Sequence, residues 1–217
     1  MSEMGAKPRR ADAARNIDKI IVAARECFRR DGPDVSLHVI AREAGVGPAT
    51  LFRNFADKEQ LVLAALSQRL SVKVAPVAAA ALRADDAAQG LLSVTAALLE
   101  VASEELNLLA AATSRQRLLV GATFPLLESL RTLLARGQEQ GAIRADLSPN
   151  DVVPLLAMTV GALETNVRGS DSWRRYLLIL ADGILTPAAA RPLPEADPVP
   201  GVGHRSPRRP RPAHPLG

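Results

Sequence analysis

Residues 41–61 read AREAGVGPATLFRNFADKEQL, and in this stretch glycine and proline interrupt a chain that is otherwise helical in character. Gly45 follows an apolar helical segment and can supply the left-handed backbone that ends a helix. Gly47 suits the N-cap of a new helix, and Pro48 suits its first position, where a missing N–H costs nothing. The stretch therefore predicts a tight turn between two short helices.

The second of these short helices has two distinct faces. Leu51 and Phe55 are four residues apart, which places both on one side of a helix and predicts that they face inward. Ala49 and Arg53 point the opposite way at 100° per residue. The outward and flanking positions carry side chains suited to reading DNA: Ala49, Thr50, Phe52 and Arg53. Phe52 fits the rim of the core equally well.

Two helices are predicted upstream of the turn. Apolar residues recur at helical spacing from about Asp12 to Arg30, namely Ile17, Ile20, Ile21, Ala24 and Phe28. Ser36 then suits the N-cap of a short helix that reaches Ala44. Cys27 is expected to be a small buried side chain.

A further helix is predicted to begin at Lys58. Asp57 and Gln60 have the spacing of an N-terminal capping box. A lysine in the first turn of a helix opposes the helix dipole by about 0.3–1 kcal/mol, so a compensating negative group is expected nearby. The phosphate of a nucleic acid would satisfy both the ammonium and the helix N–H groups.

Two short helices joined by a glycine turn after a longer helix make a helix-turn-helix. From about Arg15 to Leu66 the chain resembles the DNA-binding domain of TetR-family transcriptional repressors. The resemblance rests on CFRRDG, SLHVIAREAGV, GPATLFRNF and DKEQL, in family order. Gly47 and Asn54 stand where the family more often has serine and histidine or tyrosine. The resemblance implies these DNA-binding residues: Ser36, Pro48, Ala49, Thr50, Phe52, Arg53, Asn54 and Lys58.

Composition restricts the other function classes. The chain has 217 residues, one cysteine and three histidines, so neither an internal disulfide nor zinc-ligand spacing is available. We find no secretory signal and no apolar run of membrane-spanning length, which predicts a soluble cytoplasmic protein. Lys and Arg outnumber Asp and Glu by 11 to 8 in residues 1–58 and by 5 to 2 in residues 187–217, against 11 to 13 between them. Basic ends favour a polyanionic partner.

Residues 59–186 are predicted to form a helical bundle without a catalytic set, metal site or cofactor. The expected helices span residues 58–83, 86–103, 104–112, 115–140, 149–168 and 171–186. Pro125 should kink its helix at Phe124, and the space opened there is expected to hold a ligand beside Phe124, Pro125 and Met158.

The TetR resemblance implies that the bundle binds a small molecule and forms a homodimer through its last two helices. Small residues there permit close helix approach. The expected dimer residues are Ala157, Gly161, Ala162, Trp173 and Leu177.

The predicted organisation is all-α, with a flexible basic arm at 1–11, a three-helix DNA-binding domain at 12–58, a ligand-binding and dimerisation bundle at 59–186 and a disordered Pro/Arg-rich tail at 187–217. The expected function is a dimeric repressor that binds a near-palindromic double-stranded operator, is released by a small apolar effector and has no enzymatic activity. Two alternatives stay open. One is an architectural DNA-binding protein without an effector, and the other is a helical enzyme or carrier.

Overall fold

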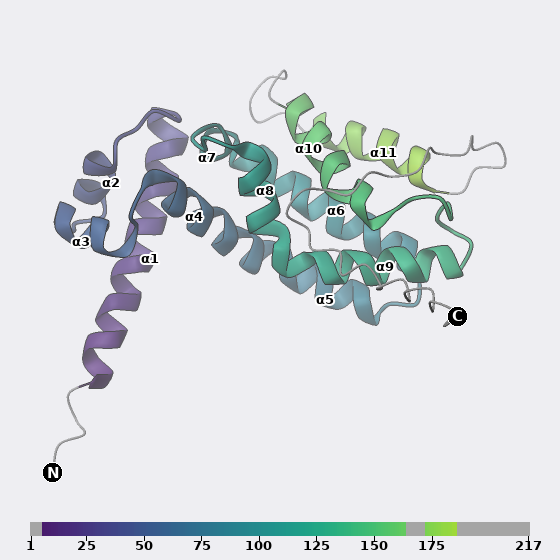
Figure 1. Cartoon of the computed structure of the whole chain (residues 1–217), viewed down its shortest axis with the longest axis horizontal. Coiled ribbons are helices and arrows are strands. Elements are labelled where there is room, and N and C mark those ends of the chain that lie inside the picture. The colour runs from purple at the N-terminus through teal and green to yellow at the C-terminus, as the bar shows by residue number, and fades with distance from the viewer. Residues whose placement is uncertain (1–5, 164–171, 186–217) are drawn as a thin grey trace, which may run out of the picture.

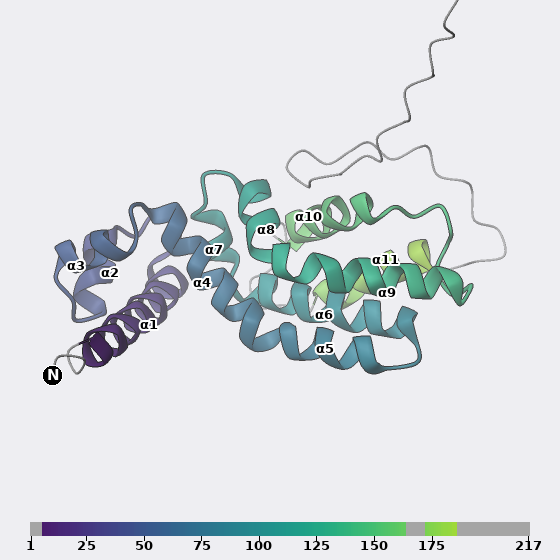
Figure 2. The ribbon, with the colours of Figure 1, turned by 60° about the horizontal axis from the view of Figure 1, so that its bottom comes forward.

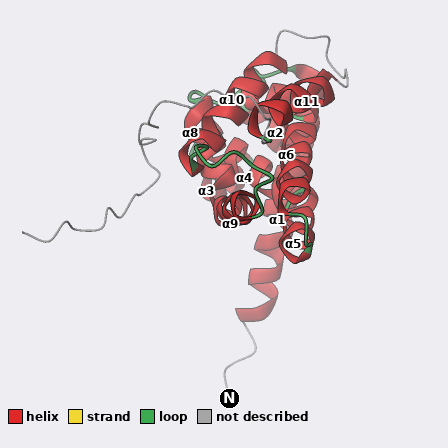
Figure 3. Cartoon of the chain, turned by 90° about the vertical axis from the view of Figure 1, so that its right-hand side faces the viewer, coloured by secondary structure: helices red, strands yellow, loops and turns green. Residues whose placement is uncertain are grey.

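The computed structural model describes residues 6–163 and 172–185, and every regular element in these two ranges is a helix (Figures 1 and 3). In chain order the elements are α1 (Ala6–Asp31), α2 (Leu37–Glu43), α3 (Pro48–Asn54), α4 (Lys58–Lys73), α5 (Ala75–Arg83), α6 (Ala87–Glu104), α7 (Leu106–Ala110), α8 (Arg115–Thr123), the 3-10 turn η1 (Phe124–Leu126), α9 (Leu127–Glu139), the 3-10 turn η2 (Pro149–Asp151), α10 (Val152–Leu163) and α11 (Ser172–Ile184). The expected all-α fold is confirmed.

Helices α1, α2 and α3 form a small unit at one end of the molecule (Figure 1). Its core is built by fully buried apolar side chains from all three helices, including Ile20, Phe28, Ile40 and Leu51. Helix α1 begins at Ala6 rather than near Asp12, so residues 6–11 belong to the helix.

Helix α4 leaves this unit and runs into the bundle, which connects the two parts of the molecule through one continuous element (Figure 1). The predicted single helix over residues 58–83 is wrong, because α4 ends at Lys73 and α5 starts at Ala75. Pro76, at the second position of α5, explains the break. Proline lacks the N–H of a helix interior, and its ring crowds the preceding turn.

Helix α6 lies at the centre of the bundle, where it contacts α4, α5, α9, α10 and α11 (Figure 2). Its buried face includes Leu91, Val94, Leu98 and Leu99. The kink predicted at Phe124 is confirmed, since the 3-10 turn Phe124–Leu126 separates α8 from α9.

Two stretches, Lys58–Arg83 and Arg117–Glu139, reach the length and hydropathy of a membrane span, contrary to the sequence expectation. Both are interrupted within the bundle, the first between α4 and α5 and the second at the 3-10 turn. Their buried residues, such as Leu61, Leu66, Leu130 and Leu133, build the core. Core helices of this kind are as apolar as membrane helices, so length and composition alone do not distinguish the two.

The expected helix ends at 164–168, 171 and 186, the first five residues and the tail at 187–217 lie outside the described residues.

Candidate nucleic-acid interface

The turn between α2 and α3 is set by the capping residues that the sequence predicted. The Ser36 hydroxyl accepts a hydrogen bond from the Val39 N–H at 3.4 Å, which confirms Ser36 as the N-cap of α2. Gly45 has φ +66°, the left-handed conformation that favours glycine. Gly47 is the N-cap of α3 and Pro48 its first residue. These local features fix the angle at which α3 leaves the turn.

Helix α3 presents its polar face to solvent. Leu51 and Phe55 are buried, as predicted, while Ala49 and Arg53 are exposed on the opposite side. The Phe52 side chain is 44% exposed, which answers the question of its placement, since it projects from the core rather than filling it. The outward surface of α3 therefore carries apolar, hydroxyl and guanidinium groups. The buried Leu51 and Phe55 anchor this short helix.

Three side-chain contacts organise this outward surface, one of them from Arg53 Nη2 to the Thr50 hydroxyl at 3.5 Å. The Asn54 side-chain amide donates to the Thr50 carbonyl at 2.7 Å, so part of its hydrogen-bonding capacity is used within α3. Phe52 meets the His38 ring of α2 edge to face, with ring centroids 5.8 Å apart and planes at 69°. The aromatic pair limits the freedom of Phe52 and adds His38 to the outward surface. The sequence alone did not reveal this pairing.

Lys58 lies at the N-terminus of α4, beside the loop between α1 and α2. Its ammonium donates to the Pro33 carbonyl at 2.6 Å and stands 5.5 Å from the centre of the Phe28 ring. These two groups supply the compensation expected for a cation at a helix N-terminus. An ammonium has three N–H donors, so two remain for an incoming anion.

The capping box predicted at the start of α4 is present with a shifted partner. The Asp57 carboxylate accepts from the Gln60 N–H at 2.8 Å, as expected of the N-cap. The Gln60 amide oxygen accepts from the Ala56 N–H at 3.2 Å, one residue before the N-cap. The first turn of α4 is therefore fixed from both sides.

The interior of the bundle holds a cavity of about 30 Å³. Its wall is apolar except for one hydroxyl, and it is formed by α4, α6, α7, α8 and α10 through Leu66, Leu70, Leu98, Leu99, Val101, Ala102, Leu109, Leu119, Thr123, Val153, Leu156 and Val160. A volume of this size is about the share of one water molecule in the liquid.

None of the three residues predicted to line the ligand site borders this cavity. Phe124 is 66% exposed and Pro125 is exposed as well, because the 3-10 turn places both on the outer side of the kink. Met158 points to a different, open groove. The kink was predicted correctly, but the side on which it leaves space was wrong. Thr123, directly before the turn, is the residue that reaches the cavity.

That second groove lies between α10 and α11 and has a volume of about 380 Å³. Met158 (71% exposed) and Ile179 (60% exposed) are large apolar side chains at its surface, and Leu178 is comparably exposed on α11. Ala157, Gly161, Ala162 and Leu177 are half-buried. Trp173, predicted to lie in a dimer interface, is only 4% exposed and belongs to the core of the protomer, so it has almost no surface to offer a partner.

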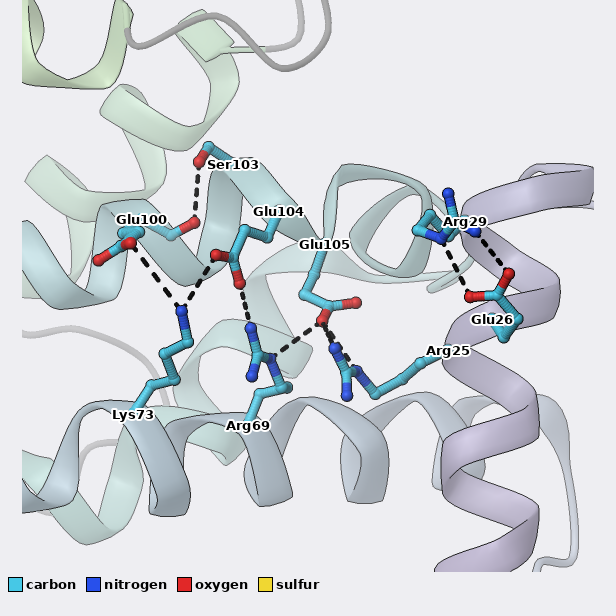
Figure 4. Close-up of polar contacts among 9 residues, drawn as sticks. All are labelled: Arg25, Glu26, Arg29, Arg69, Lys73, Glu100, Ser103, Glu104 and Glu105. Carbon is cyan, nitrogen blue, oxygen red and sulfur yellow. Dashed lines mark hydrogen bonds and ion pairs between the residues drawn. The ribbon is translucent and has the colours of Figure 1, made fainter.

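Ion pairs connect α1 and the connecting helix α4 to the bundle (Figure 4). Glu105, between α6 and α7, accepts from Arg25 of α1, and Glu104 accepts from Arg69 and Lys73 of α4. Burial raises the pKa of the Glu104 carboxyl, but the hydrogen bonds from Lys73 and Arg69 outweigh it and hold that pKa below its usual range. No sequence pattern revealed these pairs, because their partners are 31 to 80 residues apart.

A helix-turn-helix whose second helix exposes its outward face, joined to a larger helical bundle, is typical of DNA-binding transcriptional regulators. The family profile described as bacterial regulatory proteins, tetR family, matches residues 20–65, and that of the SbtR-like transcriptional regulator C-terminal domain matches residues 91–186. The chain belongs to the TetR family of transcriptional regulators, which are DNA-binding proteins and not enzymes.

Solved structures agree with this assignment. The TetR regulator of Mycobacterium vanbaalenii is 28% identical over 82% of this chain and 100% of its own, with a TM-score of 0.53. SCO0520 of Streptomyces coelicolor is 28% identical over 80% of this chain and 99% of its own, with a TM-score of 0.52. FadR of Bacillus subtilis, solved in complex with stearoyl-CoA, shares the fold with a TM-score of 0.61. Its sequence is 19% identical over 77% of this chain and 98% of its own. No curated protein matches the sequence.

Proposed function

We propose that the protein is a dimeric, sequence-specific repressor in the cytoplasm that binds a near-palindromic operator and is released by a small apolar effector. The observation that carries the DNA-binding part is the exposed face of α3, held out by the buried Leu51 and Phe55. Arg53, Thr50, Ala49 and Phe52 reach base edges in the major groove. Ser36, Pro48, Asn54 and Lys58 position the unit on the phosphate backbone.

The exposed apolar groove of α10 and α11 supports dimerisation. Large apolar side chains at 60–71% exposure gain free energy when a second copy covers them. A Cβ placed on Gly161 would meet no atom within 4 Å, so the backbone there is open to close approach by a partner helix. Ala162 lines the same groove, and Ala157 and Leu177 are half-buried residues of the same two helices. Trp173 supports this surface indirectly, because its buried side chain holds α11 on the bundle.

The apolar cavity supports an effector of low polarity, since Thr123 is the one polar side chain that the described residues contribute to its wall. A volume of about 30 Å³ does not admit an organic molecule, so the effector must bind a conformation in which the surrounding helices have separated. FadR of Bacillus subtilis, which shares the fold, was solved in complex with stearoyl-CoA, a ligand with a long apolar chain. Because α4 forms part of the wall and also begins at Lys58, separation of these helices moves the DNA-binding unit.

We expect the effector and the operator to weaken each other's binding to the protein by the same factor. If a compound binds the DNA-incompetent conformation better, with a coupling of about 1–3 kcal/mol, the operator must lower the affinity for that compound by the same factor. Apolar compounds found by thermal shift are to be titrated against free protein and against the protein–operator complex. A compound with the same affinity in both titrations is not the effector, and a screen that yields only such compounds favours an architectural DNA-binding protein.

A further inference from the structure

Glu105 occupies the one residue between α6 and α7, and its side chain is 7% exposed. Its Oε1 accepts two hydrogen bonds from Arg25 of α1, from Nε at 2.8 Å and Nη2 at 2.5 Å. The same oxygen lies 3.2 Å from Nε of Arg69 on α4. One buried carboxylate oxygen thus joins the helix-turn-helix unit to both the connecting helix and the bundle (Figure 4).

This junction is incompletely satisfied. Arg69 Nε is buried and makes no hydrogen bond, although it is in ion-pair range of Glu105. Nε and Nη2 of Arg25 already bond to that oxygen, and Arg69 is also held by Glu104, so the two guanidinium groups share the Glu105 carboxylate. A buried charge that loses its partner is costly, so the positions of α1 and α4 at this junction depend on each other.

The junction also borders the cavity. Ala102 lies on α6, three residues before Glu105, and Leu109 lies on α7, four residues after it. Leu70, next to Arg69, lines the cavity from α4. Three of the helices that form the cavity wall, α4, α6 and α7, therefore carry or directly flank Arg69 and Glu105.

We propose that Glu105 is the positioning residue through which occupation of the cavity reaches the DNA-binding unit. While the cavity is closed, Glu105 holds Arg25 and Arg69 together and fixes α1 on the bundle in the orientation that binds the operator. When the cavity fills, α4 and α6 separate, the shared contact breaks and α1 is released. This inference rests on the proposed function for its consequence on DNA, but its mechanical part is independent of DNA.

The mechanical part is tested by filling the cavity from inside the chain. Ala102→Leu adds three carbon atoms to the wall, whereas the control Ala87→Leu overpacks a buried site at the far end of the same helix. We expect Ala102→Leu to speed amide hydrogen exchange in α7 and in the last turn of α1 by about tenfold or more, while Ala87→Leu leaves those amides protected. Equal exchange in the two variants would overturn the proposal.

The functional part is tested by removing the charge at the junction. Glu105→Gln is expected to weaken operator binding by about tenfold or more, within the usual range of allosteric coupling. Glu26→Gln is the matched control, because it removes a carboxylate whose partner, Arg29, lies on the same helix and is exposed. Arg25→Gln breaks only the α1 side of the junction and should reproduce the loss, which guards against misfolding of Glu105→Gln.

The double variant distinguishes the role of Glu105 from the DNA-binding function itself. Ala102→Leu should cost much less operator affinity in the Glu105→Gln background than in the wild type, since the link is already broken there. Simple additivity, or wild-type operator affinity in both Glu105→Gln and Arg25→Gln, would contradict the role of Glu105. Failure of the wild type to bind any DNA would instead refute the proposed function, and the exchange experiment would still decide the mechanical link.

Discussion

Ile179→Glu is expected to dissociate the dimer and to weaken operator binding by about a hundredfold or more. Ile179 is an apolar side chain at 60% exposure on the groove between α10 and α11, so the substitution should be tolerated by an isolated protomer. In a dimer the new carboxylate would be taken out of water, which is strongly unfavourable for a charged group. A monomer has one helix-turn-helix unit instead of two, so it loses the avidity that raises affinity by about 10²–10⁴-fold.

Sedimentation equilibrium and fluorescence anisotropy with operator DNA measure the two effects. Val72→Glu is the matched control, since Val72 is a comparably exposed apolar residue on α4, outside the groove, and its variant should remain dimeric. Gly161→Phe provides a second test, because its side chain meets open space in the protomer but would collide with a closely packed partner. A dimeric Ile179→Glu protein with wild-type operator affinity would show that the interface lies elsewhere.

Arg53→Ala and Lys58→Ala are expected to damage DNA binding in different ways. Arg53 projects from the exposed face of α3, where a bidentate contact with a guanine edge discriminates by about 1–3 kcal/mol. Its loss should relax the preference at one base pair in each half-site. Lys58, beside the loop that holds Pro33, should add affinity without sequence information. Its loss should weaken all DNA alike and lower the log–log salt slope by about 0.9 per phosphate contact.

Binding of both variants to the operator and its single-base variants, over a salt series, distinguishes the roles. Lys58 also holds the Pro33 carbonyl, so the melting temperature of Lys58→Ala must accompany its affinity. A uniform loss of affinity in Arg53→Ala with unchanged base preferences would make Arg53 a phosphate contact. Specificity would then lie with Thr50, Phe52 or Ala49.

Local signals account for what the sequence predicted well. The ends of α2 and α3 follow from Ser36, Gly45 and Pro48, whose effects act within a few residues and depend little on the rest of the fold. The inward face of α3 follows from helical periodicity in the same way. The kink at Phe124 was predictable because proline imposes it.

Tertiary packing accounts for what the sequence missed. Which side of the kink faces the cavity depends on how α8 and α9 sit against the bundle, so Phe124 and Pro125 were assigned to the wrong side. Trp173 was assigned to an interface, although its burial is decided within the protomer. The pair Arg25–Glu105 joins residues 80 positions apart, and no periodicity in one sequence reports such a contact.

Selection of DNA fragments from a random pool by the purified full-length protein tests the proposed function most directly. A dimer of helix-turn-helix units reads two half-sites about 34–36 Å apart, or a multiple of that distance. The selected fragments are therefore expected to share a near-palindrome with this spacing, and Arg53→Ala should lose the preference at symmetric positions in both halves. Fragments without a shared sequence, or with one unpaired half-site bound as tightly as two, would contradict a dimeric sequence-specific repressor.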